Sequence, residues 1–306
     1  MIVLLYLMTY AFYGYLQPRA LGPGPIAALM NNTAPLALAA AGQTLVVLSR
    51  GFDLSVVGVI SICNVVLAVY PLEGPGGAIA SVLICLAIGG LVGSVNGWVV
   101  AYLKVQPIAA TLATMIICQG IAHLILSAPG GFVAEWISYE MTDRLWKVIP
   151  VSGLVVLAVV VMWLFIRRTD FGVSLYAIGA DESAAALSGV NVRQVRFYTF
   201  VLAGMLYGLA GFMMSAQTAT GSPSAGEPLL LLSFAAVALG GTSLAGGRGG
   251  VFASIMGAAL LMLLQKVLFS SGVSSFYTGF FQGIILIIAV VFSGLLSRAG
   301  EKNDHA

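Results

Sequence analysis

Charged side chains are scarce in this chain of 306 residues. Lysine, arginine, aspartate and glutamate make up 8% of it and hydrophobic residues 60%, and the mean hydropathy is +1.04. A soluble domain carries roughly 25% charged residues, so a water-soluble fold of this length could not cover its surface with charge. The shortage excludes a cytosolic enzyme, a nucleic-acid-binding protein and a disordered chain, and it leaves a polytopic membrane protein. The net charge of +2 is too small to indicate an acidic partner.

Cysteine and histidine are also rare. Cys63, Cys85 and Cys118 lie inside apolar runs and form no CxxC pair, His123 stands alone in an apolar run, and His305 lies in the tail. A metal site needs a closer cluster of such ligands. We therefore predict neither a metal nor a cofactor, and we expect the cysteines to pack as small hydrophobic residues.

Motifs for nucleotide binding and hydrolysis are missing as well. The chain contains no G-x-x-x-x-G-K-[ST], no G-x-S-x-G and no HExxH. Residues 240–250 are rich in glycine but hold no lysine that could reach a phosphate. We therefore predict a protein that is not an enzyme, has no catalytic residues and does not itself bind ATP.

Long uncharged runs fill most of the chain. A helix needs about 20 apolar residues to cross a bilayer. Ten runs are candidates: 2–16, 35–49, 54–71, 79–103, 107–128, 149–166, 197–217, 229–245, 250–269 and 276–296. They predict an all-α integral membrane protein, a polytopic bundle of about ten transmembrane helices in which some are short or broken. One membrane domain would cover residues 1–306, and the first run lacks the basic flank and cleavage pattern of a removable signal.

Lysine and arginine between the runs predict the orientation. With ten spans and a cytoplasmic N-terminus, nine basic residues face the cytoplasm: Arg50, Lys104, Arg167, Arg168, Arg193, Arg196, Arg248, Arg298 and Lys302. Four face outward: Arg19, Arg144, Lys147 and Lys266, the last near the end of a run, where it can snorkel. The positive-inside rule favours this arrangement, which places both termini and residues 167–196 in the cytoplasm.

Two of the runs, 35–49 and 229–245, are short and meet turn-like segments at residues 49–53 and 240–250. Broken helices often line the cargo site of a transporter, although short helices with tight turns would look the same in sequence. Four identities link the two segments at a spacing of 198 residues, which is too few to establish a repeat. The matched residues are Gly42, Thr44, Arg50 and Gly51 with Gly240, Thr242, Arg248 and Gly249.

The polar residues inside the runs are mostly uncharged. They are Gln43, Thr44, Asn64, Asn96, Thr111, Thr114, Gln119, Gln217 and Gln282. Amides and hydroxyls suit a neutral, hydroxyl-bearing cargo, whereas a proton- or sodium-coupled carrier usually needs ionisable groups in its spans. The same groups also hold membrane helices together, so both interpretations of each residue stay open.

Without an ion gradient, the energy for transport must come from a partner, and residues 167–196 are the longest polar stretch available to receive it. Residues 179–189 within it predict a short helix, with Asp181 as N-cap and Glu182 in the first turn. Gly189 suits the left-handed turn that ends a helix. A helix of such small residues can seat in a groove of another protein, or it can be a connector that packs on its own membrane domain.

Four stretches, in order, are similar to one family. Residues 42–55, GQTLVVLSRGFDLS, resemble its G-x-T…GG-I-D-L-S segment. Residues 96–97 with 107–115, PIAATLATM, resemble N-G…P-F-I-x-T-L-x-T-M. Residues 179–190 resemble the family's coupling motif, which docks on an ATPase subunit. Residues 240–249, GGTSLAGGRG, resemble its G-G-T-S-L-x-G-G-x-G signature. From about residue 30 to 296 the chain thus resembles the permease of bacterial ABC importers for ribose, xylose, arabinose and galactosides, in a superfamily that also carries branched-chain amino acids and nucleosides.

This resemblance implies a multi-pass protein of the bacterial inner membrane with three kinds of partner. They are an ABC ATPase that binds the ATP, a periplasmic solute-binding protein, and a second permease that completes a homodimer or heterodimer. It implies that Gly179, Asp181, Glu182, Ala185 and Gly189 contact the ATPase. Asp53 and Ser55 match the D-L-S pair and join the predicted cargo path, whose other members are Gln43, Thr44, Asn64, Asn96, Thr111, Thr114 and Gln119.

Some positions depart from the family pattern. Val57 replaces a usual glycine, Ser49 and Arg50 replace small residues, and Leu230 and Leu232 stand where many relatives carry an acidic pair. One-sided departures of this kind would fit one half of a heterodimer. We therefore expect an importer permease for a neutral sugar, with a nucleoside or amino acid permease, or a stand-alone secondary carrier or channel, as the alternatives.

Overall fold

The computed structural model describes residues 2–272, 280, 283 and 284. Almost all of the predicted run 276–296, with Gln282, Arg298, Lys302 and His305, lies outside these residues. The described part forms twelve α-helices, one 3₁₀ helix and a two-stranded sheet. In chain order they are α1 (Ile2–Leu16), η1 (Pro18–Leu21), α2 (Pro23–Leu48), α3 (Val56–Val69), α4 (Gly74–Ala101), α5 (Pro107–Ile125), α6 (Glu135–Glu140), β1 (Arg144–Leu145), β2 (Ile149–Pro150), α7 (Val151–Ile166), α8 (Asp170–Ala180), α9 (Glu182–Leu187), α10 (Val192–Thr218), α11 (Leu229–Leu239) and α12 (Val251–Ser270).

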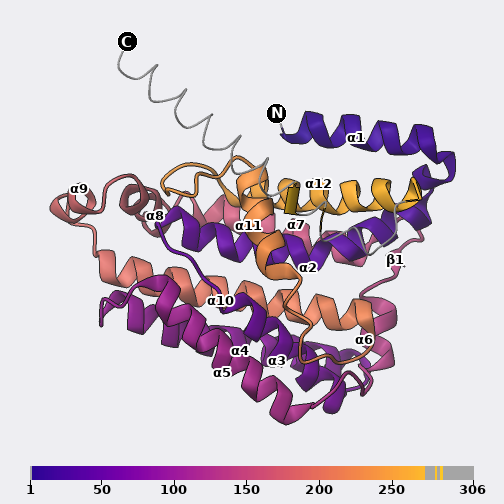
Figure 1. The fold of residues 1–306 in the computed structure, drawn as a ribbon, viewed down its shortest axis with the longest axis horizontal. Coiled ribbons are helices and arrows are strands. Elements are labelled where there is room, and N and C mark those ends of the chain that lie inside the picture. Colours follow the sequence, from indigo (N-terminus) through magenta and orange to yellow (C-terminus); the bar gives the residue numbers. More distant parts are fainter. Residues whose placement is uncertain (1, 273–279, 281–282, 285–306) are drawn as a thin grey trace.

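Helix α10 lies at the centre of the bundle. It packs between α4 on one side and α2 on the other, α2 in turn packs on α12, and α1 lies outermost against α12 (Figure 1). Glycines allow α4 and α10 to approach closely, because a Cβ at Gly89 would lie 2.0 Å from the carbonyl oxygen of Gly204 and one at Gly208 would lie 2.1 Å from that of Cys85. Small residues at helix contacts are the usual means by which membrane helices pack.

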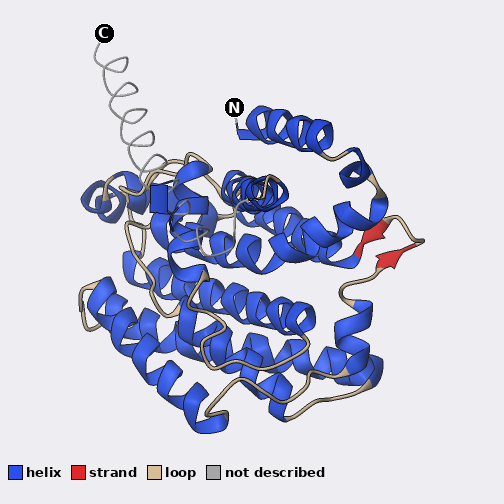
Figure 2. Ribbon diagram, turned by 45° about the vertical axis from the view of Figure 1, so that its right-hand side comes forward, coloured by secondary structure: helices blue, strands red, loops and turns tan. Residues whose placement is uncertain are grey.

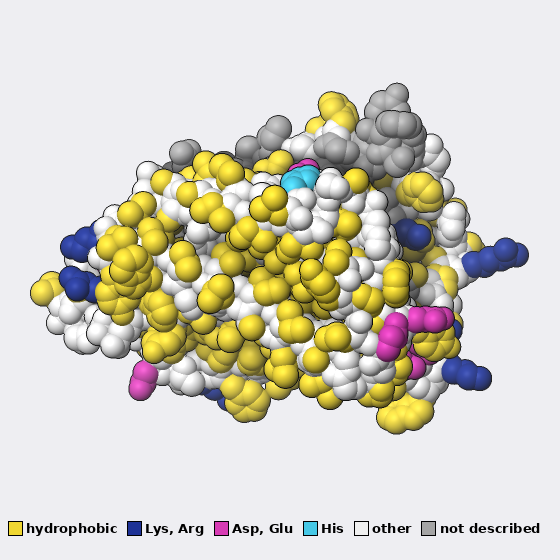
Figure 3. All heavy atoms as spheres, turned by 90° about the horizontal axis from the view of Figure 1, so that it is seen from below, with side chains coloured by type: hydrophobic (Ala, Val, Ile, Leu, Met, Phe, Trp, Pro, Cys, Tyr) yellow, Lys and Arg dark blue, Asp and Glu magenta, His cyan; other side chains and the backbone are white. Residues whose placement is uncertain are grey.

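The exterior of the bundle is apolar, as a lipid-facing surface requires. Leu83, Leu91, Ile117 and Leu124 are each at least 60% exposed. Figure 3 shows hydrophobic side chains over the middle of one face, with most of the visible charges toward the two ends. Helices α4, α5, α10 and α12 are long and apolar enough to cross a membrane, and α7 with α8 passes the same test as a pair bent by 81°. The predicted all-α membrane architecture is confirmed.

The structure changes two predicted spans. The run 35–49 is the second half of α2, which begins at Pro23 and continues through Pro35. Pro23 lies in the first turn of α2, where a missing N–H removes no intrahelical hydrogen bond. Pro35 removes one such bond inside the helix, and α2 continues through it. The run 229–245 shortens to α11, which ends at Leu239. The breaks expected after 49 and 240 are present as the loops 49–55 and 240–250.

Helices α8 and α9 lie at one end of the bundle, and the short hairpin of β1 and β2 lies away from them (Figure 2). The hairpin pairs Arg144 with Pro150 and Leu145 with Ile149. Helix α6 and β1 lie between the predicted runs 107–128 and 149–166, and β2 takes the first two residues of the second run. Two-residue strands and a six-residue helix carry too few positions for a periodic pattern to predict them.

Candidate functional site

Helix α9 is the exposed tip of the 167–196 loop. The carboxylate Oδ1 of Asp181 accepts hydrogen bonds from the backbone N–H groups of Ser183 (2.8 Å) and Ala184 (2.9 Å). These bonds hold the pKa of Asp181 below its usual range. Gly189 takes φ +88 after the last turn. The N-cap and the glycine stop predicted from the sequence are therefore confirmed.

One side of α9 packs inward and the other faces solvent. Ala185 is buried, whereas Leu187 is 91% exposed. A large apolar side chain this open at the tip of a small-residue helix is available to a partner. Glu182 forms an ion pair with Arg196 (2.7 Å), which connects α9 to the start of α10. Because the Glu182 side chain is about half exposed, the pair contributes little to stability.

Gly179 does not belong to the short helix in which the sequence placed it. It lies in α8, at the end that precedes α9. A Cβ at this position would lie 1.9 Å from the carbonyl oxygen of Leu48 and 2.4 Å from the backbone nitrogen of Gly247. The end of α2, the end of α8 and the 240–250 loop thus meet here, and only glycine leaves room for three backbones to cross.

Hydrogen bonds join the three segments at this crossing. Arg50 donates from Nε to the carbonyl oxygen of Gly179 (2.8 Å) and from Nη2 to that of Ala180 (2.5 Å). The Gly247 N–H donates to the carbonyl oxygen of Leu48 (3.1 Å). We call Leu48, Arg50, Gly179, Ala180 and Gly247 the junction. It connects the base of α9 to both segments that the sequence identified as broken.

The sequence did not identify Arg50 as a functional residue. Arg50 counted as a positive charge, as one of the four matched identities and as a departure from the family pattern, yet the structure makes it the main side chain of the junction. Arg50 has φ +61, a left-handed conformation that is unfavourable for a non-glycine residue. The sequence feature that could have indicated this role is a lone arginine directly after a long apolar run. At the end of such a helix the last carbonyl groups need hydrogen-bond donors.

The 240–250 loop is attached to the same end of the bundle. Tyr176 donates from its hydroxyl to the carbonyl oxygen of Gly249 (2.8 Å). Thr242 accepts from the Gly250 N–H (3.2 Å), and its hydroxyl lies 3.1 Å from that of Ser254. A cleft of about 300 Å³ opens beside the junction, with Arg50 and Arg248 in its lining. The loop is thus tied to α8 and to α12.

Five of the nine predicted path residues form one buried network. Ser55 donates to Asp53 Oδ1 through its hydroxyl (2.6 Å), and Asn96 donates to the Ser55 hydroxyl (2.9 Å). Thr114 donates to the side-chain oxygen of Asn96 (2.8 Å), and Thr111 accepts from the backbone of residue 54 (3.1 Å). The network joins the 49–55 loop to α4 and α5, so the structure gives these residues a role in holding helices together.

The other four predicted path residues lie apart from this network. Asn64 donates to the carbonyl oxygen of Thr220 and accepts from the Ser222 N–H. Gln43 accepts from the Tyr207 hydroxyl (2.9 Å). Thr44 bonds back to its own helix, and Gln119 donates weakly to Glu227 (3.4 Å). Cargo contact by any of the nine stays a prediction.

Two of the predicted path residues retain an unpaired buried atom, Asp53 through Oδ2 and Gln43 through Nε2. Buried polar atoms without a partner are uncommon in native proteins. Both residues precede or lie within the break between α2 and α3, where the sequence predicted an irregular span.

A polar cavity of about 370 Å³ opens in the half of the bundle away from α9. Its polar lining residues are Asn32, Gln217, Gln265 and Lys266. The sequence had noted Gln217 only as an interior amide and Lys266 only as a snorkelling charge. Asn32 and Gln265 were missed, because nothing in a helical sequence shows which polar residues of different helices meet.

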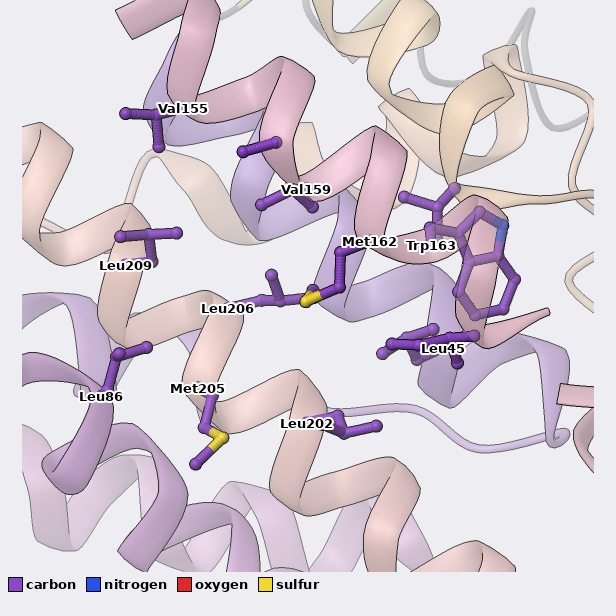
Figure 4. A pocket seen from close by; sticks show the side chains of 13 residues that line it. Leu45, Leu86, Val155, Val159, Met162, Trp163, Leu202, Met205, Leu206 and Leu209 are labelled. Atoms are coloured by element: carbon purple, nitrogen blue, oxygen red, sulfur yellow. The ribbon is translucent and has the colours of Figure 1, made fainter. Parts of the chain in front are cut away.

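Two further cavities are almost wholly apolar. One of about 430 Å³ lies between α2, α4, α7 and α10 and is lined by side chains such as Leu45, Met162 and Met205 (Figure 4). Another, of about 450 Å³, lies between α1, α2, α7 and α12. Surfaces of this kind suit hydrocarbon and offer almost nothing to a hydroxylated solute.

Comparisons with known proteins agree with this architecture. The family model described as "Branched-chain amino acid transport system / permease component" matches residues 26–290. The ribose import permease protein RbsC of Bacillus subtilis (strain 168) is 36% identical over 279 residues, 90% of this chain and 86% of the relative. RbsC of Escherichia coli (strain K12) is 32% identical over 294 residues, 93% and 90% of the two chains. No solved structure shows a significant match.

A third relative carries a different name. The autoinducer 2 import system permease protein LsrC of Yersinia pseudotuberculosis serotype O:3 (strain YPIII) is 31% identical over 301 residues. The match covers 97% of this chain and 85% of the relative. Each of these three relatives is therefore similar to this chain over 90% or more of the length of this chain.

Proposed function

The chain belongs to the branched-chain amino acid transport system / permease component family, and from this premise we propose that it is the transmembrane subunit of an ATP-binding-cassette importer for a neutral sugar. The observation that carries the proposal is the exposed, capped helix α9, which the junction joins to α2, α8 and the 240–250 loop. A membrane bundle without a nucleotide-binding motif needs such a contact to receive the work of an ATPase. The chain itself is a multi-pass transport component of the bacterial inner membrane rather than a catalytic one.

A neutral, hydroxylated cargo is supported by two kinds of observation. The relatives RbsC and LsrC are named for import of ribose and of autoinducer 2. Most polar groups inside this bundle are amides and hydroxyls, which both donate and accept hydrogen bonds as sugar hydroxyls do. A branched-chain amino acid, which the family description names, carries a carboxylate and an ammonium group and would need charged or dipolar partners for both.

The ATPase is proposed to seat on α9. The N-terminal turn of α9 presents Asp181 and Glu182, and its far end presents the open side chain of Leu187. ATP would bind to the partner and not to this chain. Movement of α9 would pull on Gly179 and Ala180, and through Arg50 and Gly247 on the ends of α2 and of the 240–250 loop. Both irregular segments of the bundle would then move together.

We place the α9 end of the bundle in the cytoplasm. Basic residues gather there, in agreement with the positive-inside rule; within the described residues they are Arg50, Lys104, Arg167, Arg168, Arg193, Arg196 and Arg248. The hairpin end holds Arg19, Arg144 and Lys147. This orientation supports docking of an ATPase at α9 and of a periplasmic binding protein at the opposite end.

A second permease would complete the central path. At the start of α11, Leu230 is half-buried and Leu232 is buried, so the leucines that replace the expected acidic pair pack mainly within the bundle, and Leu231 between them is 63% exposed. Purification of the assembled complex and mass measurement of its permease subunits would distinguish a homodimer from a heterodimer. A single permease species would remove the heterodimer.

Reconstitution in proteoliposomes tests the proposal. The permease with its ATPase and a loaded binding protein should accumulate ribose or another neutral pentose or hexose when ATP is supplied, and the permease alone should not. Transport of sugar down its gradient by the permease alone would indicate a secondary carrier or channel. Accumulation of leucine but no sugar by the full complex would indicate an amino acid importer.

A further inference from the structure

The polar cavity described above lies among the ends of helices at the proposed periplasmic side. Asn32 lies in the first half of α2, and Gln217 stands one residue before the end of α10. Gln265 and Lys266 lie in the second half of α12. The first residue of α11, Leu229, completes one wall. Four helices therefore contribute to one space, which is a common setting for ligand sites in helical bundles.

The chemistry of the lining is mixed in a way that fits a sugar. Three carboxamides and one ammonium group stand among apolar side chains such as Met214, Met262 and Phe269, and none of the described residues that line the cavity is a carboxylate. Carboxamides donate and accept, as hydroxyls do, while apolar walls fit the C–H faces of a sugar ring. Gln217 already donates directly to Asn32, so these two amides meet in the lining of the cavity. Two of the amides are therefore oriented toward a common space before any ligand enters.

Lys266 adds a charge to this space. It is partly buried in an apolar helix, and the part of the chain that the structure describes provides no carboxylate within ion-pair distance of it. An ionisable residue within a membrane helix usually marks a substrate or ion pathway. An ammonium group can donate up to three hydrogen bonds, so it can bind a hydroxyl or ring oxygen without a counter-charge.

Helix α2 is irregular beside the cavity. Pro35, which also lines the cavity, has no N–H and so leaves the carbonyl oxygen of residue 31 without its intrahelical donor. Irregular backbone at membrane depth is tolerated where it lines a cavity, and transporters place their cargo at such points. The two apolar cavities described above have no carboxamide and no lysine among the described residues that line them.

We propose that this cavity is the receiving site for the hydroxylated cargo, in which Asn32, Gln217 and Gln265 bind hydroxyl groups and Lys266 donates to a further sugar oxygen. The inference rests on the proposed function, because the cargo must be a neutral sugar and the hairpin end of the bundle must face the periplasm. It assigns cargo contact to residues outside the predicted path, whose buried network holds the helices instead.

Transport stoichiometry tests the assignment in the complete transporter. Proteoliposomes with ATPase and binding protein are assayed for sugar imported and ATP hydrolysed, first with a panel of pentoses and hexoses to find the sugar that the wild type imports. The cavity variants are Asn32→Leu, Gln217→Leu and Lys266→Met. The matched control is Thr33→Val, because Thr33 neighbours Asn32 but bonds to its own helix at Leu29 and lines a different cavity.

We expect the cavity variants to import about tenfold less sugar per ATP, the size of effect expected for one or two lost hydrogen bonds. The stimulation of their ATPase rate by the loaded binding protein should stay within about twofold of wild type. For Thr33→Val, both the sugar imported per ATP and the ATPase stimulation should stay within about twofold of wild type. Cavity variants that import sugar as the wild type does, or that lose assembly and ATPase activity together, would overturn the assignment. A wild-type complex that imports no sugar at all would overturn the proposed function itself.

Thiol protection gives a second, independent readout. The native Cys63, Cys85 and Cys118 are buried, so a Gln265→Cys variant carries one accessible thiol in the cavity. The imported sugar should slow its reaction with a small membrane-impermeant reagent added from the binding-protein side, and a sugar that is not imported should not. Equal labelling rates with both sugars would count against a cargo site.

Discussion

Gly179→Ala tests whether the junction holds the base of α9 to the membrane helices. In a helix, alanine is about 1 kcal/mol more favourable than glycine, so the helix itself should gain from the change. The added Cβ would lie 1.9 Å from the Leu48 carbonyl oxygen and 2.4 Å from the Gly247 nitrogen. Both neighbours are backbone atoms, so the segments must separate.

The expected loss follows from the bonds that separation removes. The junction contains two bonds from Arg50 and one from Gly247. At about 1 kcal/mol for each bond, their loss amounts to about 3 kcal/mol. After the gain in helix propensity, a net destabilisation of about 2 kcal/mol remains, which corresponds to a melting temperature lower by about 5 °C on the scale for single domains.

Two assays report on this variant. Melting of the purified protein in detergent, followed by tryptophan fluorescence, measures the loss of stability. The ATPase rate of the assembled complex, with and without loaded binding protein, measures coupling, and we expect the stimulation to fall while basal hydrolysis persists. Gly120→Ala is the matched control, because Gly120 lies in α5 with no neighbouring atom within 4 Å of the added Cβ. A Gly179→Ala protein that melts and couples like the Gly120→Ala protein would refute the reasoning.

Four further predictions concern the loop and the buried network. Asp181→Ala should unravel the start of α9 and reduce uptake, whereas Asp181→Asn keeps a capping oxygen and should retain most of it. The pKa of Asp181 is lowered in the folded chain. The cap is therefore fully present at pH values above the ordinary carboxyl pKa, and it is lost as the pH falls through the lowered pKa. Hydrogen-exchange protection of the Ser183 and Ala184 amides should disappear with the cap. Asp181→Lys combined with Glu182→Lys should abolish uptake with the protein still in the membrane, and normal transport would contradict docking at α9. Asn96→Ala removes the partners of Ser55 and Thr114 and should destabilise the protein by about 2 kcal/mol, measured by thermal melting; an unchanged melting temperature would argue against the network.

Several features of this protein were predictable from short-range pattern. Apolar runs identified the helices α1, α4, α5, α7, α10 and α12 to within a few residues, because a membrane helix satisfies its own backbone hydrogen bonds and therefore depends mainly on local hydrophobicity. The Asp181 cap and the Gly189 stop were predictable for the same reason, since both act within one turn of α9. The predicted start of α2 at residue 35 was wrong, because α2 begins at Pro23. The effect of a proline such as Pro23 or Pro35 on a helix depends on its position and surroundings.

Contacts between distant segments were not predictable. The residues Gly42–Gly51 and Gly240–Gly249 showed only four matched identities, with nothing to indicate that their ends would meet at Gly179. The sequence also could not assign roles among its interior amides: Asn96 joins a buried network, while Asn32 and Gln217 bond to each other in the lining of a cavity. The packing of the helices therefore places side chains of the same type in different environments.

Composition, hydrophobic pattern and capping residues thus determined that this chain is a helical membrane protein, where most of its helices run and how α9 begins and ends. These properties depend on each residue and its neighbours within a few turns. Tertiary structure decided that Arg50 binds the end of α8, that Gly179 lies where three backbones cross, and that Lys266 shares a cavity with three amides. Such relations arise only when helices far apart in sequence pack together, since the contacts of a helix surface depend on which other helix covers it.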